Sequence, residues 1–291
     1  MSSPGRRFAQ FVAIDWSGAV GPRQKGIAVA ECTAGDAAPA LVRPGHIWSR
    51  AEVLDQIRAA GRDTLIGVDL GPALPFVDRG AYFPEWSESP TDARGLWALV
   101  EQLCTDDAHF AASSFIDHPE AARHFRRHGG RTGDLFEPGR GRLRETERAQ
   151  QRMGLSPYSN LNLVGAAQVG KSSLTGMRLL HRLDGQVAVW PFDPVPETGA
   201  VLVELYTTLA AIAAGRTPSR SKMRSHAELD AALVALGSRA GGGDGPISDH
   251  ASDAILTAAW MRIVADRPNF WHPLGLTEQI ARTEGWTFGV V

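Results

Sequence analysis

Four acidic residues occupy positions where their side chains could act together. Three of them lie at or near the ends of segments with β-strand composition, and the fourth lies in an alanine-rich segment with helical composition: Asp15, Asp69, Glu204 and Asp253, in that order. His250 precedes Asp253 by three residues, so both side chains share one face of the predicted helix. Carboxylates that converge repel one another, and a divalent cation that prefers oxygen ligands, such as Mg²⁺ or Mn²⁺, removes this repulsion.

Each of these residues also has a simpler interpretation. A single aspartate before a turn is more often a helix cap or a turn residue than a ligand. A single histidine is more often a solvated side chain than a catalytic one. The joint pattern carries more weight, because strands that run side by side bring their ends to the same edge of a sheet.

The segments that must position these residues predict an α/β fold. Strands are expected at 8–16, 26–31, 41–48, 64–70 and 200–206, with a further short strand at 186–190. Helices are expected at 49–60, 174–183, 207–215, 225–237 and 247–265. Three meandering strands followed by helix and strand alternation predict a five-stranded mixed sheet with helices on both faces.

The segment between the fourth strand and residue 185 has a different composition. Proline, glycine and tryptophan interrupt it, and short helical patches occur near 91–104, 118–128 and 143–153. It shows no series of strands. We therefore expect one domain over residues 1–291 that carries a long helical insertion at 78–185.

The composition excludes several classes of protein. Hydrophobic residues make up 43% of the 291 residues, so disorder is not the main state, and a net charge of −2 excludes a polycation that coats nucleic acid. Two cysteines are too few for a disulfide scaffold or a cysteine-rich zinc module. No apolar stretch approaches the roughly 20 residues that span a membrane. A cytoplasmic location is therefore expected.

Several segments resemble a known family. They are Val12-Ala-Ile-Asp15-Trp-Ser-Gly-Ala19, Lys25-Gly-Ile-Ala-Val-Ala30, Ile66-Gly-Val-Asp69-Leu-Gly-Pro-Ala-Leu-Pro75, Leu143-Arg-Glu-Thr-Glu147, Val169-Gly-Lys-Ser-Ser-Leu-Thr-Gly-Met177, Val189-Trp-Pro-Phe192, Val203-Glu-Leu-Tyr206 and Ser252-Asp-Ala254. In this order they resemble domain-of-unknown-function family 429, the predicted nucleases of the RNase H-like superfamily. The resemblance extends over nearly the whole chain.

This resemblance implies a metal-dependent nuclease or phosphodiesterase that hydrolyses nucleic acid, DNA or RNA. Asp15, Asp69 and Asp253 would hold two Mg²⁺ or Mn²⁺ ions, with Asp15 as the bridging ligand. Glu204 and His250 would complete the site, either as further ligands or in proton transfer. The sequence departs from the family pattern at Thr207, where the family often has proline.

A basic segment could supply contacts to a phosphate backbone. Residues 123–152 contain nine arginines and four acids, a net charge of +5, which leaves −7 on the rest of the chain. Arg142, Arg144 and Arg148 are the candidate phosphate-binding residues. The alternative is a solvated helical face with local ion pairs.

A second phosphate motif competes with the first interpretation. Residues 165–172 fit the pattern G-x-x-x-x-G-K-[ST] of a nucleotide-binding P-loop, in which Gly170, Lys171 and Ser172 would contact phosphate. A P-loop normally follows the first strand of a parallel sheet, whereas this one lies late in the chain. An ATPase or kinase of the P-loop or actin-like type, a phosphodiesterase acting on small nucleotides, and a non-catalytic binding protein remain alternatives.

Overall fold

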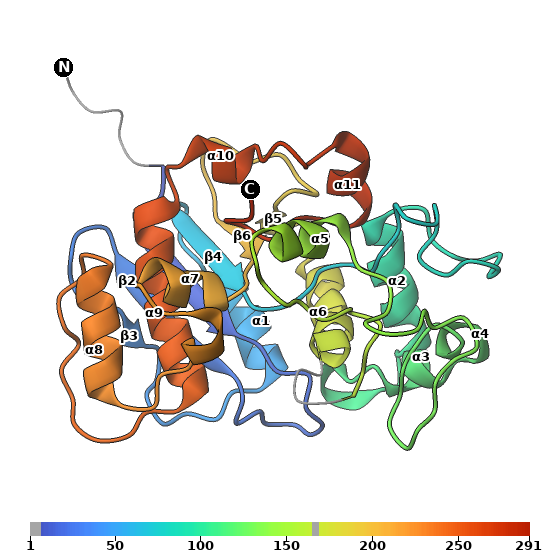
Figure 1. Cartoon of the computed structure of the whole chain (residues 1–291), viewed down its shortest axis with the longest axis horizontal. Coiled ribbons are helices and arrows are strands. Elements are labelled where there is room, and N and C mark those ends of the chain that lie inside the picture. Colours follow the sequence, from blue (N-terminus) through green and yellow to red (C-terminus); the bar gives the residue numbers. More distant parts are fainter. Residues whose placement is uncertain (1–6, 165–168) are drawn as a thin grey trace.

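The computed structural model describes residues 7–164 and 169–291, and within them one mixed sheet forms the centre of the fold (Figure 1). Its strand order is β3–β2–β1–β4–β6–β5. The strands are β1 (Gln10–Asp15), β2 (Ala28–Thr33), β3 (Ala40–Leu41), β4 (Thr64–Val68), β5 (Ala188–Val189) and β6 (Val201–Glu204). The first three form an antiparallel meander, and β4, β6 and β5 continue the sheet parallel to β1.

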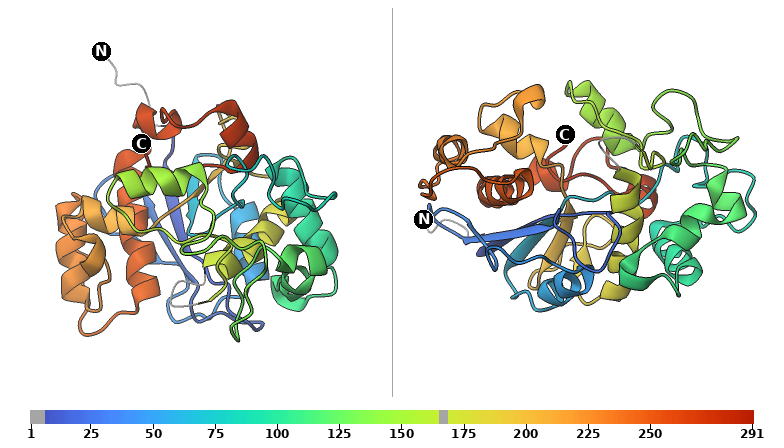
Figure 2. Two further views of the ribbon diagram at one scale, coloured as in Figure 1. Left: turned by 45° about the vertical axis from the view of Figure 1, so that its right-hand side comes forward. Right: turned by 90° about the horizontal axis from the view of Figure 1, so that it is seen from below.

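Helices cover both faces of this sheet (Figure 2). The α-helices are α1 (Arg50–Arg58), α2 (Ala93–Leu103), α3 (Ser113–Asp117), α4 (Pro119–Ala122), α5 (Glu145–Arg152), α6 (Val169–Leu183), α7 (Thr208–Ala213), α8 (His226–Ala235), α9 (Asp249–Val264), α10 (Pro268–Trp271) and α11 (Glu278–Thr283). Two 3₁₀ turns, η1 (Ala108–Phe110) and η2 (Pro218–Arg220), complete the set. Helices α1 and α6 pack on one face, and α9, with α7 and α8 beside it, covers the other.

Alternation along β1 determines which side chains face which layer. Val12 and Ile14 belong to the hydrophobic core shared with α1 and α6, whereas Phe11 and Ala13 belong to the core under α9. Side chains two residues apart share a face. Asp15 therefore continues the row that faces α9.

Gly67 of β4 allows α9 to lie directly on the sheet. A Cβ at this position would be 2.8 Å from the Met261 sulfur of α9 and would also collide with the Leu205 side chain. Because glycine lacks this atom, the helix and strand approach closely. This contact holds α9 over the strands that carry the candidate acids.

The α/β class and the mixed sheet with flanking helices are as predicted, but the sheet has six strands in the described residues and not five. The short segment predicted at 186–190 pairs with β6 as β5, which adds the sixth strand. The predicted third strand, 41–48, is shortened to β3, because Arg43 has a φ of 52° and Gly45 a φ of 78°. This turn directs the chain away from the sheet.

Two further differences concern helices. The helix predicted at 118–128 covers only Pro119–Ala122. It cannot continue through Arg126, because the backbone of that residue forms β-bridges with Thr132 and Asn162. Helices α10 and α11 near the C-terminus were not predicted.

Side chains of the insertion, among them Trp97 and Phe115, share a core with β1.

Two predictions from composition can be compared with the structure. Cys32 and Cys104 are both buried free thiols. None of the described helices is both long and apolar enough to span a membrane.

Helix α1 begins with a capping box whose contribution to stability is expected to depend on pH. The Ser49 hydroxyl accepts from the Glu52 amide, and the Glu52 carboxylate accepts from the Ser49 amide at 2.8 Å. The Ser49 amide is the main cause that lowers the pKa of Glu52 to about 2, and Arg23 adds to it. An acid whose pKa is depressed by folding stabilises the protein above its unfolded pKa of 4.5, and this stabilisation is lost as the pH falls toward 2.

Glu52→Gln should therefore lower the free energy of unfolding by about 1 kcal/mol at pH 7, the usual value of a helix cap. Urea unfolding at pH 7 and pH 3 measures the change, and the gap to wild type should shrink at the lower pH. Asp55→Asn, at an exposed position on the same helix, is the control. A gap that widens at pH 3 would contradict this prediction.

Candidate functional site

Three of the predicted acids meet at one edge of the sheet. Strands β1 and β4 run in parallel, and Ile14 pairs with Val68, so Asp15 and Asp69 each come one residue after this pair. The Asp69 amide donates to the Ile14 carbonyl at 2.9 Å. Asp253 reaches the same place from α9. The same helix supplies His250, whose Nδ1 lies 2.7 Å from Oδ2 of Asp15.

The charges in this cluster affect one another. Burial raises the pKa of Asp69 well above its usual value, and the neighbouring carboxylates of Asp15 and Asp253 raise it further. Burial is also the main cause that raises the pKa of Asp253. The Asp69 carboxylate forms no hydrogen bond or ion pair with any side chain or amide in the described ranges, and it lines a cavity. A carboxylate in this position favours either a proton or a cation.

Lys222, which the sequence patterns did not identify, supplies a cation to the cluster. It lies in the loop between η2 and α8, and its ammonium donates to Oδ2 of Asp253. Burial opposes the charged form, but the carboxylates of Asp253, Asp15 and Asp69 together raise the pKa of Lys222. No motif marks this lysine. Its only sequence signal is a short basic stretch that also holds Arg216, Arg220 and Arg224.

His250 is placed to exchange protons. The hydrogen bond with Asp15 is the main cause that raises the pKa of His250, so the imidazolium form is favoured. Its side chain is 49% exposed, and Nε2 has no hydrogen-bond partner among the described residues. A half-exposed imidazolium that lines the cavity can donate a proton to a ligand.

The donor set suits a hard divalent cation in type, because it consists of carboxylate oxygens and one imidazole. In the described part of the chain, however, no three acidic, histidine or cysteine side chains are arranged so that they could hold a metal ion. Asp15 is bonded to His250 instead, and Asp253 is bonded to Lys222. Of the three aspartates, Asp69 alone has no such partner within residues 7–164 and 169–291.

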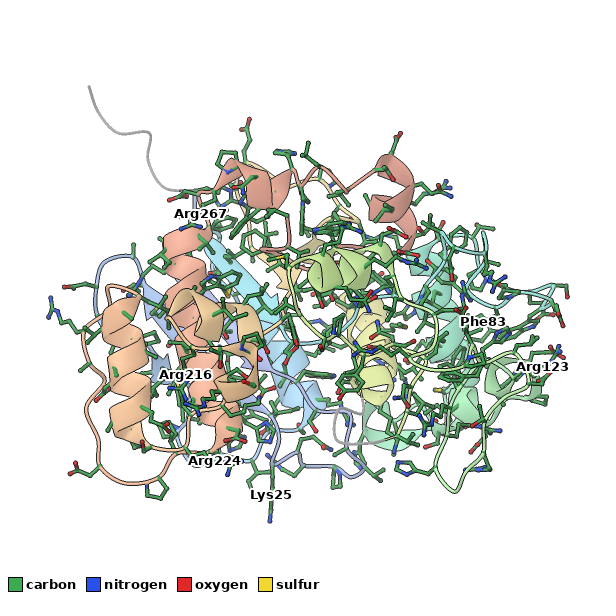
Figure 3. The ribbon with its side chains drawn as sticks, viewed as in Figure 1. Lys25, Phe83, Arg123, Arg216, Arg224 and Arg267 are labelled. Atoms are coloured by element: carbon green, nitrogen blue, oxygen red, sulfur yellow. The ribbon has the colours of Figure 1, made fainter. Side chains whose placement is uncertain are left out.

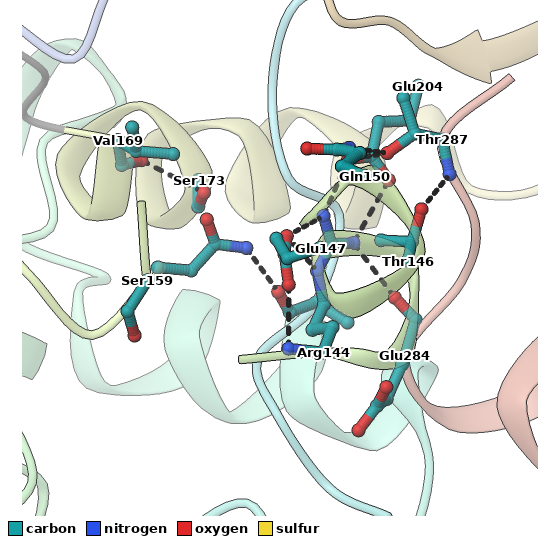
Figure 4. Close-up of polar contacts among 12 residues, drawn as sticks. Arg144, Thr146, Glu147, Gln150, Ser159, Val169, Ser173, Glu204, Glu284 and Thr287 are labelled. Carbon is teal, nitrogen blue, oxygen red and sulfur yellow. Dashed lines mark hydrogen bonds and ion pairs between the residues drawn. The ribbon is translucent and has the colours of Figure 1, made fainter. Parts of the chain in front are cut away.

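Glu204 lies at the same sheet edge but in a different network (Figure 4). Oε1 and Oε2 accept from Nη2 and Nη1 of Arg144 at 2.5 and 2.9 Å, and the Thr287 hydroxyl donates to Oε1 at 2.9 Å. Both oxygens are therefore engaged. Leu202, two residues earlier, faces the α1 and α6 core, so Glu204 continues the row opposite to α9.

Arg144 connects Glu204 to α5. Besides Glu204, its guanidinium donates to Oε1 of Glu147 at 2.6 and 2.8 Å and to the Glu284 carbonyl at 2.9 Å. Burial opposes the charged form of Arg144, but Glu147 and Glu204 more than offset this and raise its pKa. The side chain is 1% exposed, so this is a buried, fully paired cation.

A cavity of about 530 Å³ joins the two clusters. Its charged lining comes from both: Asp69, Lys222 and His250 on one side, and Arg144, Glu147 and Glu204 on the other. Tyr158, 52% exposed, stands in the wall. The cavity is large enough for a small ligand or for part of a polymer.

The other predicted phosphate-binding arginines do not line this cavity. Arg142 is buried and donates to Asp78 and to the carbonyls of Pro75, Ala81 and Tyr82, so it fastens a loop. Arg148 is exposed and pairs with Glu145. Six of the nine arginines of the segment form ion pairs, so neighbouring acids neutralise most of the positive charge of the segment. Arg123, one of the six, lies at the outer edge of the insertion (Figure 3).

The P-loop-like motif is only partly described, since residues 165–168 lie outside the described ranges. Gly170 is in the first turn of α6, where its amide donates to the Asn162 carbonyl at 3.2 Å. The Ser172 hydroxyl accepts from the Gly18 amide at 3.2 Å, and the Lys171 backbone packs on Gly18. Residues 161–164 form only an isolated bridge to Arg126, so no sheet strand precedes the motif. This arrangement does not favour the nucleotide-binding alternative.

A larger cavity, of about 970 Å³, lies away from these residues. Its lining combines aromatic and proline side chains, such as Trp190 and Pro191, with charged ones: Arg7, Asp193, Asp266 and Glu278. Its Asp193 is already paired with Arg94. We therefore place the candidate chemistry in the smaller cavity.

Comparisons of the chain with models of protein families, with curated proteins and with solved structures gave no match.

Proposed function

We propose that this protein is a metal-dependent phosphodiesterase of the RNase H-like type that hydrolyses phosphodiester bonds of nucleic acid. The observation that carries the proposal is the cluster of Asp15, Asp69 and Asp253, in which Asp69 lines a cavity and its carboxylate has no hydrogen-bond or ion-pair partner among the described residues. Three like charges are costly to hold together, and a protein keeps such a cluster where a cation or a proton is part of the chemistry.

The fold supports the same proposal. An antiparallel meander continued by parallel strands is the mixed sheet that an RNase H-like domain would have. The strands that carry Asp15 and Asp69 are neighbours at its centre. Asp253 arrives from the helix that crosses them, as the resemblance implies.

The lining of the cavity suits a nucleotide ligand. The cations of Lys222 and His250 face the acidic edge, where a phosphate would lie between them and any bound metal. The Tyr158 ring is exposed in the wall and could stack on a base. Stacking on an aromatic ring is tolerant of sequence, so this site would not select particular bases.

In this mechanism Asp15, Asp69 and Asp253 would hold Mg²⁺ or Mn²⁺. The bound ions would supply an activated water and would neutralise the charge on the phosphate. His250, whose imidazolium form is favoured by Asp15, could transfer a proton to the leaving oxygen. Arg144 and Glu204 keep the opposite wall of the cavity in place.

A Mn²⁺ titration followed by calorimetry tests the metal site. We expect saturable binding in the wild type and at least about tenfold weaker binding in Asp69→Asn, because this change removes a ligand charge without altering the shape of the side chain. Asp55→Asn, which removes an exposed acid from α1, should bind like the wild type. Equal Mn²⁺ binding in the wild type, Asp69→Asn and Asp55→Asn, with or without a single-stranded oligonucleotide, would contradict the proposed function.

A cleavage panel then defines the substrate. Single-stranded and duplex DNA, RNA, a four-way junction and cyclic dinucleotides should be incubated with Mn²⁺ and the wild-type protein. Cleavage of a polymer supports the nuclease assignment, and cleavage of the cyclic dinucleotides alone would assign a small-nucleotide phosphodiesterase. Metal binding without cleavage of any substrate would favour a binding protein.

A further inference from the structure

We propose that Lys222 is a resident counter-cation that occupies the carboxylate cluster when no metal is bound, and that a divalent ion must displace it. This inference rests on the proposed metal site and concerns its regulation. Lys222 would then set the affinity of the site for a divalent ion, and with it the metal concentration at which the site is occupied.

The position of Lys222 is the first argument. Its ammonium is bonded to Oδ2 of Asp253, one of the three proposed ligands, and it interacts electrostatically with the other two, Asp15 and Asp69. An ammonium and a divalent ion compete for the same carboxylate oxygens, because both are cations that need negative oxygen partners. In the described residues no three acidic, histidine or cysteine side chains form a metal-binding group, and Lys222 is the cation bonded to the cluster through Asp253.

The mobility that displacement requires is the second argument. The Lys222 side chain is 53% exposed, so its ammonium can turn into water by rotation about side-chain bonds. The backbone next to it is held: Met223 is buried, and its carbonyl accepts from the Ser252 hydroxyl of α9 at 3.0 Å. Only the side chain has to move, and the loop can stay where it is.

The charge balance is the third argument. Without Lys222, the carboxylates of Asp69 and Asp253 would lack this counter-charge, and the imidazole of His250 is already bonded to Asp15. A lysine that neutralises the cluster in the metal-free protein therefore stabilises the fold and at the same time weakens metal binding. Displaced from the cluster, the ammonium would be free to meet a substrate phosphate at the cavity that it already lines.

The test compares Mn²⁺ affinity by calorimetry in the wild type, Lys222→Met and Lys222→Arg. Methionine keeps the length of the side chain and removes its charge, so we expect Mn²⁺ to bind at least about tenfold more tightly. Arginine keeps the charge and should give an affinity within about threefold of the wild type. Arg224→Met removes a charge from the same loop, at an 82% exposed side chain that pairs with Asp249 (Figure 3), and should bind like the wild type.

Thermal unfolding gives a second readout in case Lys222→Met is poorly folded without metal. Saturating Mn²⁺ should raise the melting temperature of Lys222→Met more than that of the wild type, because the ion replaces a missing charge. Tighter binding in Lys222→Met alone, or binding seen only in that variant, supports the inference. Equal or weaker binding and equal thermal shifts would overturn it while the metal site stands. Absence of Mn²⁺ binding in every protein would overturn the proposed function and the inference together.

Discussion

Arg144→Met is expected to lower the free energy of unfolding by about 3–5 kcal/mol, the range measured when one partner of a buried ion pair is removed. Arg144 is 1% exposed and donates to two carboxylates, those of Glu147 and Glu204, which have exposed fractions of 5% and 7%. Its removal leaves two acids close together in a buried space with no cation. Burial already raises the pKa of Glu147, and loss of the arginine should raise it further.

Urea unfolding at pH 7 measures the loss. Arg148→Met, which removes an exposed arginine from α5, the helix that Arg144 precedes, should change the free energy of unfolding by no more than about 0.5 kcal/mol. The triple variant Arg144→Met, Glu147→Gln, Glu204→Gln should recover part of the loss, because it also removes the uncompensated charges. If the triple variant is less stable than Arg144→Met alone, the charges are not the cause.

The convergence of Asp15, Asp69 and Asp253 could be predicted from the sequence because it depends on strand ends. Two adjacent parallel strands necessarily bring their carboxyl ends to one edge, and a helix that packs across them can add a third acid. The close approach of that helix also has a sequence signal, since Gly67 interrupts an otherwise bulky strand.

The separate position of Glu204 could not be predicted in the same way. Both faces of β6 are buried, so Val201, Leu202 and Val203 show no polar and apolar alternation that would indicate which face each side chain takes. The fourth acid therefore appeared equivalent to the others. Its face follows from Leu202, two residues earlier, which lies in the core on the opposite side of the sheet from α9.

The ion pairs of Lys222 with Asp253 and of Arg144 with Glu204 could not be predicted because the partners are distant in the sequence. Lys222 meets an acid 31 residues away, and Arg144 meets one 60 residues away. The net charge counted over the arginine-rich segment overstates its positive surface for the same reason. Asp78 and Asp117, which neutralise several of its arginines, lie outside the segment. Net charge counted along a segment does not give the charge of the surface that the segment forms.

Asp15→Asn and Glu204→Gln should have opposite effects, and this contrast distinguishes a catalytic carboxylate from a structural one. Asp15→Asn should lower kcat/KM for Mn²⁺-dependent hydrolysis of bis(p-nitrophenyl) phosphate by about 10²–10³-fold or more, about 3–4 kcal/mol in activation free energy. It relieves the repulsion among the carboxylates but also weakens the charged hydrogen bond with His250, so the melting temperature without metal should change less than in Glu204→Gln. Glu204→Gln weakens the charged pairing of Arg144, so it should lower the melting temperature and leave the Mn²⁺ affinity within about threefold of the wild type.

Steady-state kinetics and thermal unfolding of the two variants give this comparison directly. Residues that keep repelling charges together are held for function at a cost in stability, whereas residues whose charges are fully paired contribute to stability. If Glu204→Gln loses Mn²⁺ binding as Asp15→Asn does, Glu204 would have to leave Arg144 when the metal enters, and the two clusters would form one site. If Asp15→Asn keeps full activity, the aspartate cluster is not the catalytic centre, and the unpaired Asp69 would need another explanation.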